Sequence, residues 1–274
     1  NNASSAATHR VRITGVVVFG AFLALLNQTV MSPALPVIMA DFAIDASTAQ
    51  WIMSISPLVS GIMVPVSAFL IDRFTTRQLF FAATGAFAAG TALCAAAPTF
   101  FLLICGRVLQ AAASGVLLPL VSVVPMLVFP VEKRGTAMGM AGIVLSAGPA
   151  IGPVVGGAII DAYGWRACLG CIVPLALASL ACAVFLLDNV GEGKRPHLDV
   201  PSIALSTVAF GGMLYGFSSA SSMGWTSPVV LGCIIAGVAC LVLFDRRPLR
   251  LADPLPALRC LQSSDFAVDA LVVT

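Results

Sequence analysis

The sequence predicts an all-α fold, a polytopic bundle of transmembrane helices, and three observations carry that prediction. Hydrophobic residues fill 59% of the 274 positions, charged residues fill 9%, and the mean hydropathy is +1.03. Soluble domains carry about 25% charged residues, so this composition excludes a soluble domain. Apolar stretches of about twenty residues, long enough to cross a bilayer core, recur along the chain. Lysine and arginine gather in alternate connections between these stretches.

Eight stretches are long and apolar enough to be complete spans. They cover residues 13–37, 51–71, 79–97, 101–129, 136–160, 167–187, 201–219 and 228–244. A ninth apolar stretch comprises the nine residues 266–274, which as a helix would reach only about 13 Å. We therefore expect a fragment of a longer protein, or a truncated one.

The distribution of positive charge predicts the orientation of the chain. With the amino terminus inside, twelve of the fourteen lysines and arginines lie in cytoplasmic segments, as the positive-inside rule requires. We expect a multi-pass protein of the plasma (cytoplasmic) membrane with a cytoplasmic amino terminus. Trp51, Trp165 and Trp225 fall near predicted outer ends of spans, where an interfacial belt would explain them.

The fifth span contains two ridges of unusual residues. Glycine recurs every four positions at Gly148, Gly152 and Gly156, and Pro149 and Pro153 follow with the same period. Small residues four apart let helix backbones approach closely in a membrane, so the glycine ridge predicts a packing face. An ordinary tightly packed membrane helix remains the alternative. The helix-packing motif comprises Gly142, Gly148, Pro149, Gly152, Pro153, Gly156 and Gly157.

One arginine lies within a predicted span, where a charge is costly and is a functional candidate by default. Arg107 shares a helical face with Gln110 and Ser114, at the spacing by which a helix lines a polar cavity. We expect the first span to face the same aqueous space through its own polar patch. The residues of that patch are Asn27, Gln28, Thr29 and Ser32. Alternatively, Arg107 only ties helices together by bonding to carbonyls or to Gln28.

A charged loop joins the second and third predicted spans. Asp72, Arg73 and Arg77 could form a salt bridge in only one conformation and so act as a conformational switch. The alternative is an ordinary solvated loop.

The spans hold no cluster of histidine, cysteine, aspartate or glutamate that would activate water or a nucleophile. Cys168 and Cys171 have metal-like spacing, but no second pair accompanies them. We therefore expect no enzyme activity, no metal, no cofactor and no nucleic-acid partner.

Several stretches together resemble the fourteen-helix drug:proton antiporter branch of the major facilitator superfamily. Gly148-Pro149 through Gly156-Gly157 is similar to the antiporter motif of its fifth helix. The remaining matches are Leu70, Asp72, Arg73 and Arg77 in the loop motif, Arg107, Leu109, Gln110 and Pro119 in the fourth helix, Thr29-Val30 and Ala34-Leu35-Pro36 in the first, and Asp199, Gly224-Trp225 and Pro254-Leu255 around the seventh and eighth spans.

The chain also departs from the pattern of this branch. Asn27 stands where the resemblance implies a proton-coupling aspartate, and an amide cannot titrate. Ala68, Thr75 and Thr76 replace residues of the loop motif, and Ala111 replaces a glycine of the fourth-helix motif. No carboxylate lies away from the ends of the first six spans, so we expect the coupling acid in the missing bundle or in the ninth span, where Asp269 is a candidate.

The resemblance implies an efflux transporter that works by alternating access between two six-helix bundles. Its partners would be a small-molecule substrate, protons, the lipid bilayer and a missing carboxy-terminal bundle. The alternatives are a uniporter or importer on the same scaffold, or a truncated membrane protein that does not transport. The expected divisions are a cytoplasmic tail (1–12), the six-helix amino-terminal bundle (13–187), a cytoplasmic linker (188–200), a two-helix central insert (201–244), and a loop with the start of the ninth span (245–274).

Overall fold

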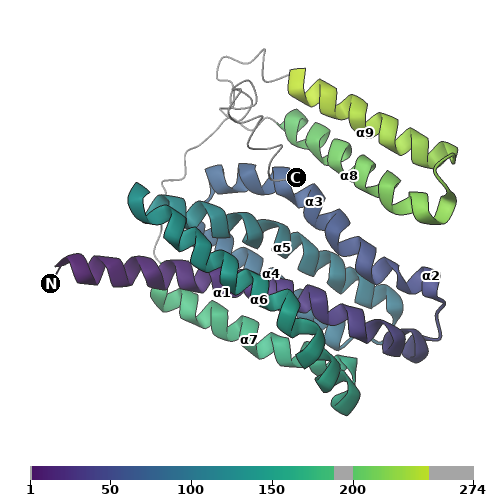
Figure 1. Ribbon diagram of the computed structural model, residues 1–274. Coiled ribbons are helices and arrows are strands. Elements are labelled where there is room, and N and C mark those ends of the chain that lie inside the picture. The colour runs from purple at the N-terminus through teal and green to yellow at the C-terminus, as the bar shows by residue number, and fades with distance from the viewer. Residues whose placement is uncertain (1, 188–199, 247–274) are drawn as a thin grey trace. The chain divides into compact units, whose positions relative to one another are not determined.

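The computed structural model describes residues 2–187 and 200–246, and every regular element among them is a helix (Figure 1). The chain forms two compact units, divided after His197. The predicted linker, apart from residue 200, and the predicted ninth span lie outside the described residues. The prediction of an all-α fold is confirmed.

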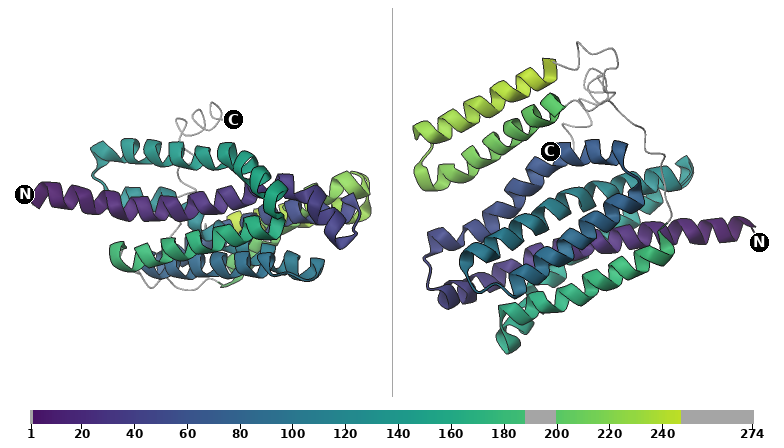
Figure 2. Two further views of the ribbon diagram at one scale, coloured as in Figure 1. Left: turned by 90° about the horizontal axis from the view of Figure 1, so that it is seen from below. Right: turned by 180° about the vertical axis from the view of Figure 1, so that it is seen from behind.

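Seven helices make up the part of the first unit that the structure describes. They are α1 (Asn2–Phe42), α2 (Ala46–Ala49), α3 (Trp51–Arg73), α4 (Thr76–Ala95), α5 (Phe100–Val128), α6 (Val131–Tyr163) and α7 (Trp165–Leu186). All but α2 are long, and they lie side by side with short connections, so that they alternate in direction (Figures 1 and 2). Helix α1 packs against α5, α6 and α7, and α4 packs against both α5 and α7. The buried apolar residues of these helices form one core.

Side chains and one glycine define where these helices begin. Thr75 caps α4 by accepting from the backbone N–H of Gln78 at 3.3 Å, while the Gln78 side chain accepts from the Thr75 N–H at 3.2 Å. This is a capping box, which satisfies two donors that a helix start leaves free. Thr99 caps α5 through its side chain alone, which accepts from the backbone N–H of Leu102 at 3.4 Å. Gly164, between α6 and α7, has φ of +82°, which glycine adopts without strain.

Five helices among the described residues are long and apolar enough to cross a membrane, or six if the two halves of bent α3 count as one span. The bend of α3 is 48° and falls between Met63 and Val66. These helices correspond to the first six predicted spans. The structure also extends α1 back to Asn2, through the segment predicted to be a tail. That segment has no proline or glycine to stop a helix, so α1 continues through it.

The described part of the second unit contains two helices, α8 (Val200–Met223) and α9 (Pro228–Arg246), packed against each other. Their backbones approach closely at glycines. A Cβ added at Gly212 would lie 3.1 Å from the Cys233 carbonyl, and one at Gly237 would lie 2.9 Å from the Ala209 carbonyl. The described part of α9 counts as a shorter apolar helix, Pro228–Leu241. The transmembrane placement of this pair, the predicted two-helix insert, therefore remains a prediction.

A polar cluster joins three connections at one end of the first unit. Arg166 pairs with Asp41, which also accepts from the indole Nε1 of Trp165 at 3.0 Å. The Arg166 guanidinium lies 4.3 Å from the centre of the Trp165 ring and donates to the Ala97 carbonyl at 3.2 Å. The end of α1, the α4–α5 connection and the start of α7 are thereby tied together. Trp165 is only 2% exposed, so the interfacial-belt interpretation is wrong for this tryptophan.

Candidate functional site

Arg107 lies on α5 and is 2% exposed, although its side chain carries a permanent charge. One terminal nitrogen donates to the Ser56 hydroxyl at 2.7 Å and, more weakly, to the Ile52 carbonyl at 3.5 Å, both on α3. The other donates to Gln110 Oε1 at 3.1 Å. No carboxylate forms an ion pair with this arginine among the described residues. The hydrogen-bond partners of Arg107 in the described part of the chain are therefore neutral oxygens, which solvate the guanidinium without neutralising it.

Gln110 connects the hydrogen-bond network to α4. Its amide nitrogen donates to the Thr91 hydroxyl at 2.9 Å, and Thr91 donates to the Phe87 carbonyl at 2.7 Å. The thiol of Cys94 also approaches Gln110 Oε1, at 3.8 Å. Because Gln110 both accepts from Arg107 and donates to Thr91, one chain of polar groups crosses from α3 through α5 to α4.

A small polar cavity lies beside this network, with a volume of about 10 Å³. That is roughly the room that one water molecule needs. Its lining residues come from α1, α3 and α5, and they are Ala24, Asn27, Gln28, Ser56, Ser60, Arg107, Gln110, Ala111 and Ser114. Asn27 is 2% exposed. Its Oδ1 and the Nε of Arg107 have no hydrogen-bond partner among the described residues, so the cavity wall offers both an acceptor and a donor.

The structure places five of the seven residues predicted to face a common polar space around one cavity. Asn27 and Gln28 approach it from α1, and Arg107, Gln110 and Ser114 from α5. Ser32 does not line this cavity and is exposed. Thr29, from the same predicted patch, bonds instead to the Leu26 carbonyl at 3.0 Å and to the Gly148 carbonyl of α6 at 3.5 Å.

The sequence interpretation missed the contribution of two other helices. Ser56 and Ser60 of α3 line the cavity, and Ser60 donates to the Ala111 carbonyl at 3.1 Å. Thr91 of α4 completes the network. Ser56 and Ser60 lie four residues apart in an apolar stretch, which puts them on one helical face. That spacing was readable, and it is the signal that could have identified α3 as a third wall.

The fifth-span glycines meet α1. A Cβ at Gly148 would lie 3.4 Å from Leu25 Cβ, one at Gly156 would lie 2.9 Å from Val30 Cγ2, and one at Gly152 would overlap the Thr29 hydroxyl. Helix α6 runs through Pro149 and Pro153 without a break, and both prolines are exposed. Gly142 and Gly157 have no heavy atom within 4 Å of an added Cβ. The motif therefore has one face against α1 and another that is open in the described part of the chain.

The charged loop holds its two arginines in different ways. Arg77 of α4 donates to the Val184 carbonyl near the end of α7 at 3.1 Å, a placement that suits the partial negative charge of a helix carboxyl end. Arg73 lies over the Phe74 ring, with 5.8 Å between the guanidinium carbon and the ring centre. Asp72 is exposed and forms no ion pair with Arg73 or Arg77. The predicted switch therefore remains a prediction.

Acidic groups of the first unit lie at helix ends and connections. The described carboxylates are exposed, and they belong to Asp41, Asp45, Asp72, Glu132 and Asp161. No group of three or more histidine, cysteine, aspartate or glutamate residues that could hold a metal ion occurs in the described residues. The Arg107 network is thus the most deeply buried charged site that the structure describes.

Comparison with known proteins places this geometry in a family. The chain is 43% identical over 266 residues to the uncharacterized MFS-type transporter YcnB of Bacillus subtilis, covering 97% of this chain and 56% of that protein. It is 38% identical to the lincomycin resistance protein LmrB of Bacillus subtilis, covering 92% and 53%. It is 30% identical to a multidrug resistance protein B homolog of Mycobacterium tuberculosis, covering 96% and 49%. The chain spans about half the length of these relatives.

The fold agrees with solved structures. The crystal structure of the peptide transporter POT in complex with sulfate superimposes with a TM-score of 0.62 at 16% identity, covering 87% of this chain and 51% of that one. A POT family transporter in complex with a thioalcohol-conjugated peptide gives a TM-score of 0.64 at 15% identity, covering 90% and 55%. The model of the Major Facilitator Superfamily matches residues 17–208. The chain therefore belongs to the Major Facilitator Superfamily.

Proposed function

We propose that the full-length protein is an efflux transporter that moves amphipathic small molecules out of the cell by alternating access. The observation that carries this proposal is the buried Arg107 site. A permanent charge held by neutral oxygens inside an apolar bundle is costly to keep. Because the network joins α3, α4 and α5 and adjoins α1, a substrate that engages it can bias the packing of several helices at once.

The relatives support the direction and the substrate class. LmrB is named for lincomycin resistance and the Mycobacterium tuberculosis protein for multidrug resistance. Resistance by a membrane transporter means outward movement of the drug. An apolar wall with few polar groups accepts ligands of varied shape, which suits a broad amphipathic substrate range.

Proton coupling would depend on an acid outside the described bundle. Asn27 cannot titrate, and the described carboxylates of the bundle are exposed. We place the coupling acid in the part of the protein that completes the second six-helix bundle. A uniporter is the second candidate, and Asn27 at a position where the first-helix motif has an aspartate is the observation that favours it.

Flux in proteoliposomes tests both candidates. We expect the full-length protein to move lincomycin or an amphipathic cationic dye against a concentration gradient when a pH gradient is imposed, and to stop when an ionophore collapses that gradient. Protein-free liposomes carrying the same pH gradient are the control. Flux that only runs down the substrate gradient, and that ignores the pH gradient, would favour the uniporter.

Replacing Asn27 by aspartate should make flux depend more steeply on the pH gradient. The change puts a titrating group into the cavity that Arg107 lines, where its charge state alters the local electrostatics. The matched control is Asn27→Leu, which keeps the size but adds no titrating group. The same proteoliposome assay, run at several imposed gradients, measures the slope. Equal slopes for wild type and Asn27→Asp would contradict the expectation.

A further inference from the structure

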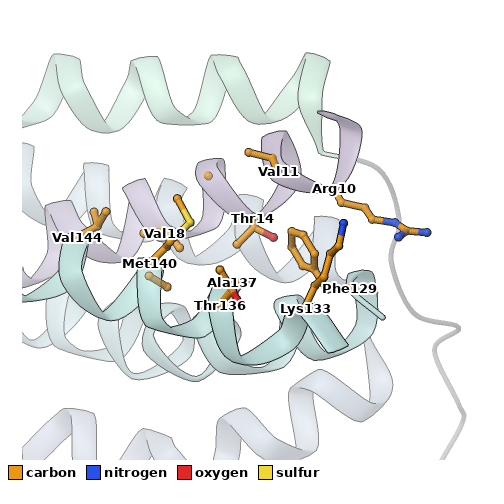
Figure 3. A pocket seen from close by; sticks show the side chains of 12 residues that line it. Arg10, Val11, Thr14, Val18, Phe129, Lys133, Thr136, Ala137, Met140 and Val144 are labelled. Carbon is orange, nitrogen blue, oxygen red and sulfur yellow. The ribbon is translucent and has the colours of Figure 1, made fainter. Parts of the chain in front are cut away.

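A second cavity lies between the amino-terminal parts of α1 and α6 and shares no lining residue with the Arg107 cavity. Its volume is about 460 Å³, within the roughly 300–1,000 Å³ of small-molecule sites. Helix α1 lines it from Arg10 to Val18 and α6 from Lys133 to Val144, while Phe129 contributes from the turn before α6 (Figure 3). The cavity is therefore elongated along two neighbouring helices.

Its two ends differ in chemistry. Arg10 and Lys133 lie at the same end, beside Phe129, whereas Met140 and Val144 lie farther along the wall (Figure 3). Neither cation forms an ion pair with a carboxylate among the described residues. Two like charges at one mouth repel each other, so an anion placed between them is favoured.

A buried threonine also lines this space. Thr14 is 8% exposed and lines the cavity, yet its Oγ1 has no hydrogen-bond partner in the described part of the chain. Figure 3 shows its side chain on the cavity side of α1, on the same wall as Arg10. A buried hydroxyl without a partner is unfavourable. Thr14 therefore adds a polar residue to the wall near the charged end.

We propose that this cavity binds an anionic phospholipid from the cytoplasmic leaflet. Its phosphate would lie beside Arg10 and Lys133, and one acyl chain would lie against the apolar wall. The distribution of lysine and arginine predicts that the amino ends of α1 and α6 are cytoplasmic, and the inner leaflet is where anionic lipids attract basic side chains.

The apolar wall distinguishes a lipid from a free anion. From Arg10 to Val18 the cavity follows α1 over nine residues, and the eight steps between the first and the last span about 12 Å at 1.5 Å per residue. A free phosphate would occupy only the charged end and leave the rest of the wall uncovered. An acyl chain covers the wall and removes its apolar surface from water.

Native mass spectrometry of the purified full-length protein tests the proposal. The probes are palmitoyl-oleoyl-phosphatidylglycerol, the phosphatidylcholine with the same chains, and sn-glycerol 1-phosphate as the free anion. We expect wild type to retain phosphatidylglycerol at least fivefold better than phosphatidylcholine, and sn-glycerol 1-phosphate to displace little of it. Removing both charges, with Arg10→Gln and Lys133→Gln together, should lower retention at least fivefold.

A plug variant separates the cavity from general surface charge. Gly15 lines the cavity, and an added Cβ there meets no heavy atom within 4 Å, so Gly15→Leu should fill the space without a clash. We expect it to lose phosphatidylglycerol while its thermal midpoint in phosphatidylcholine stays unchanged. Arg12→Gln, an exposed cation of the same helix that does not line the cavity, is the matched control and should retain the lipid.

Three results would overturn the proposal. Equal retention of the two phospholipids would show that Arg10 and Lys133 do not select an anionic lipid. Full displacement of lipid by sn-glycerol 1-phosphate would show an anion site without a chain groove. A large fall in the thermal midpoint of Gly15→Leu in phosphatidylcholine would show that another part of the polypeptide fills the cavity. None of these results bears on efflux, which the flux assay measures separately.

Discussion

Replacing Arg107 by alanine in the full-length protein is expected to lower substrate flux by at least tenfold. The change removes the donor to Ser56 and to Gln110 Oε1, and so cuts the connection between α3 and α5 within the network. Flux in proteoliposomes under a fixed pH gradient measures the effect. Arg107→Lys should recover only part of it, because an ammonium is a point charge and lacks the planar fork that reaches Ser56 and Gln110 at once.

Stability separates a functional role of Arg107 from a packing role. The arginine is buried without a paired carboxylate, so removing it also relieves the cost of burying a charge. We therefore expect the thermal midpoint of Arg107→Ala to move by only a few degrees. Val108→Ala, on the more exposed face of the same helix and outside the motif, is the control and should leave flux unchanged. Full flux in Arg107→Ala would show that Arg107 serves only in helix packing.

Much of the fold was predictable because a membrane restricts what a chain can do. Each span must satisfy its own backbone hydrogen bonds, so about twenty apolar residues predict a helix. The boundaries were harder to predict. Thr75 stood out in the sequence only as a departure from the loop motif, but with Gln78 three residues later it forms the capping box that starts α4. That signal was local and readable.

The site was predictable where polar residues repeat at helical spacing. Arg107, Gln110 and Ser114 share one face of α5, and a single charge in an apolar span is conspicuous. The other hydrogen-bond partners of Arg107 were less predictable, because they lie on another helix. Which helices pack together depends on contacts between segments far apart in the sequence. Ser56 lies 51 residues from Arg107. The second cavity was invisible for the same reason, since neither Arg10 nor Lys133 is unusual in its own segment.

Packing also explains why one tryptophan was misplaced. Trp165 follows the outer end of a span, and the sequence alone makes an interfacial position the simplest expectation. In the structure its ring packs beside Phe42, 5.8 Å between centres, and its indole donates to Asp41. Asp41 is 124 residues away in the sequence. No local pattern indicates such a partner.

Replacing Gly152 by leucine should disrupt the packing of α6 on α1. A Cβ at Gly152 already overlaps the Thr29 hydroxyl and would lie 3.1 Å from Thr29 Cβ and 3.4 Å from the Leu26 carbonyl. A larger side chain must push the two helices apart, and overpacking of this kind costs about 1–3 kcal/mol or more. We expect lower expression, a lower thermal midpoint and loss of flux in the full-length protein.

Two further variants decide whether the α1 contact is the cause. Gly157→Leu places the same side chain five residues along α6, where an added Cβ meets no heavy atom within 4 Å. It should be neutral or slightly stabilising, because glycine disfavours a helix interior by roughly 0.5–1 kcal/mol. Gly152→Ala should be milder than Gly152→Leu, and adding Thr29→Ala should restore at least half of its lost stability, since the overlapping hydroxyl is then gone. If the double variant instead loses as much stability as the two single variants together, Gly152 and Thr29 do not couple. Contact with α1 would then not be the reason that the glycine face matters for stability.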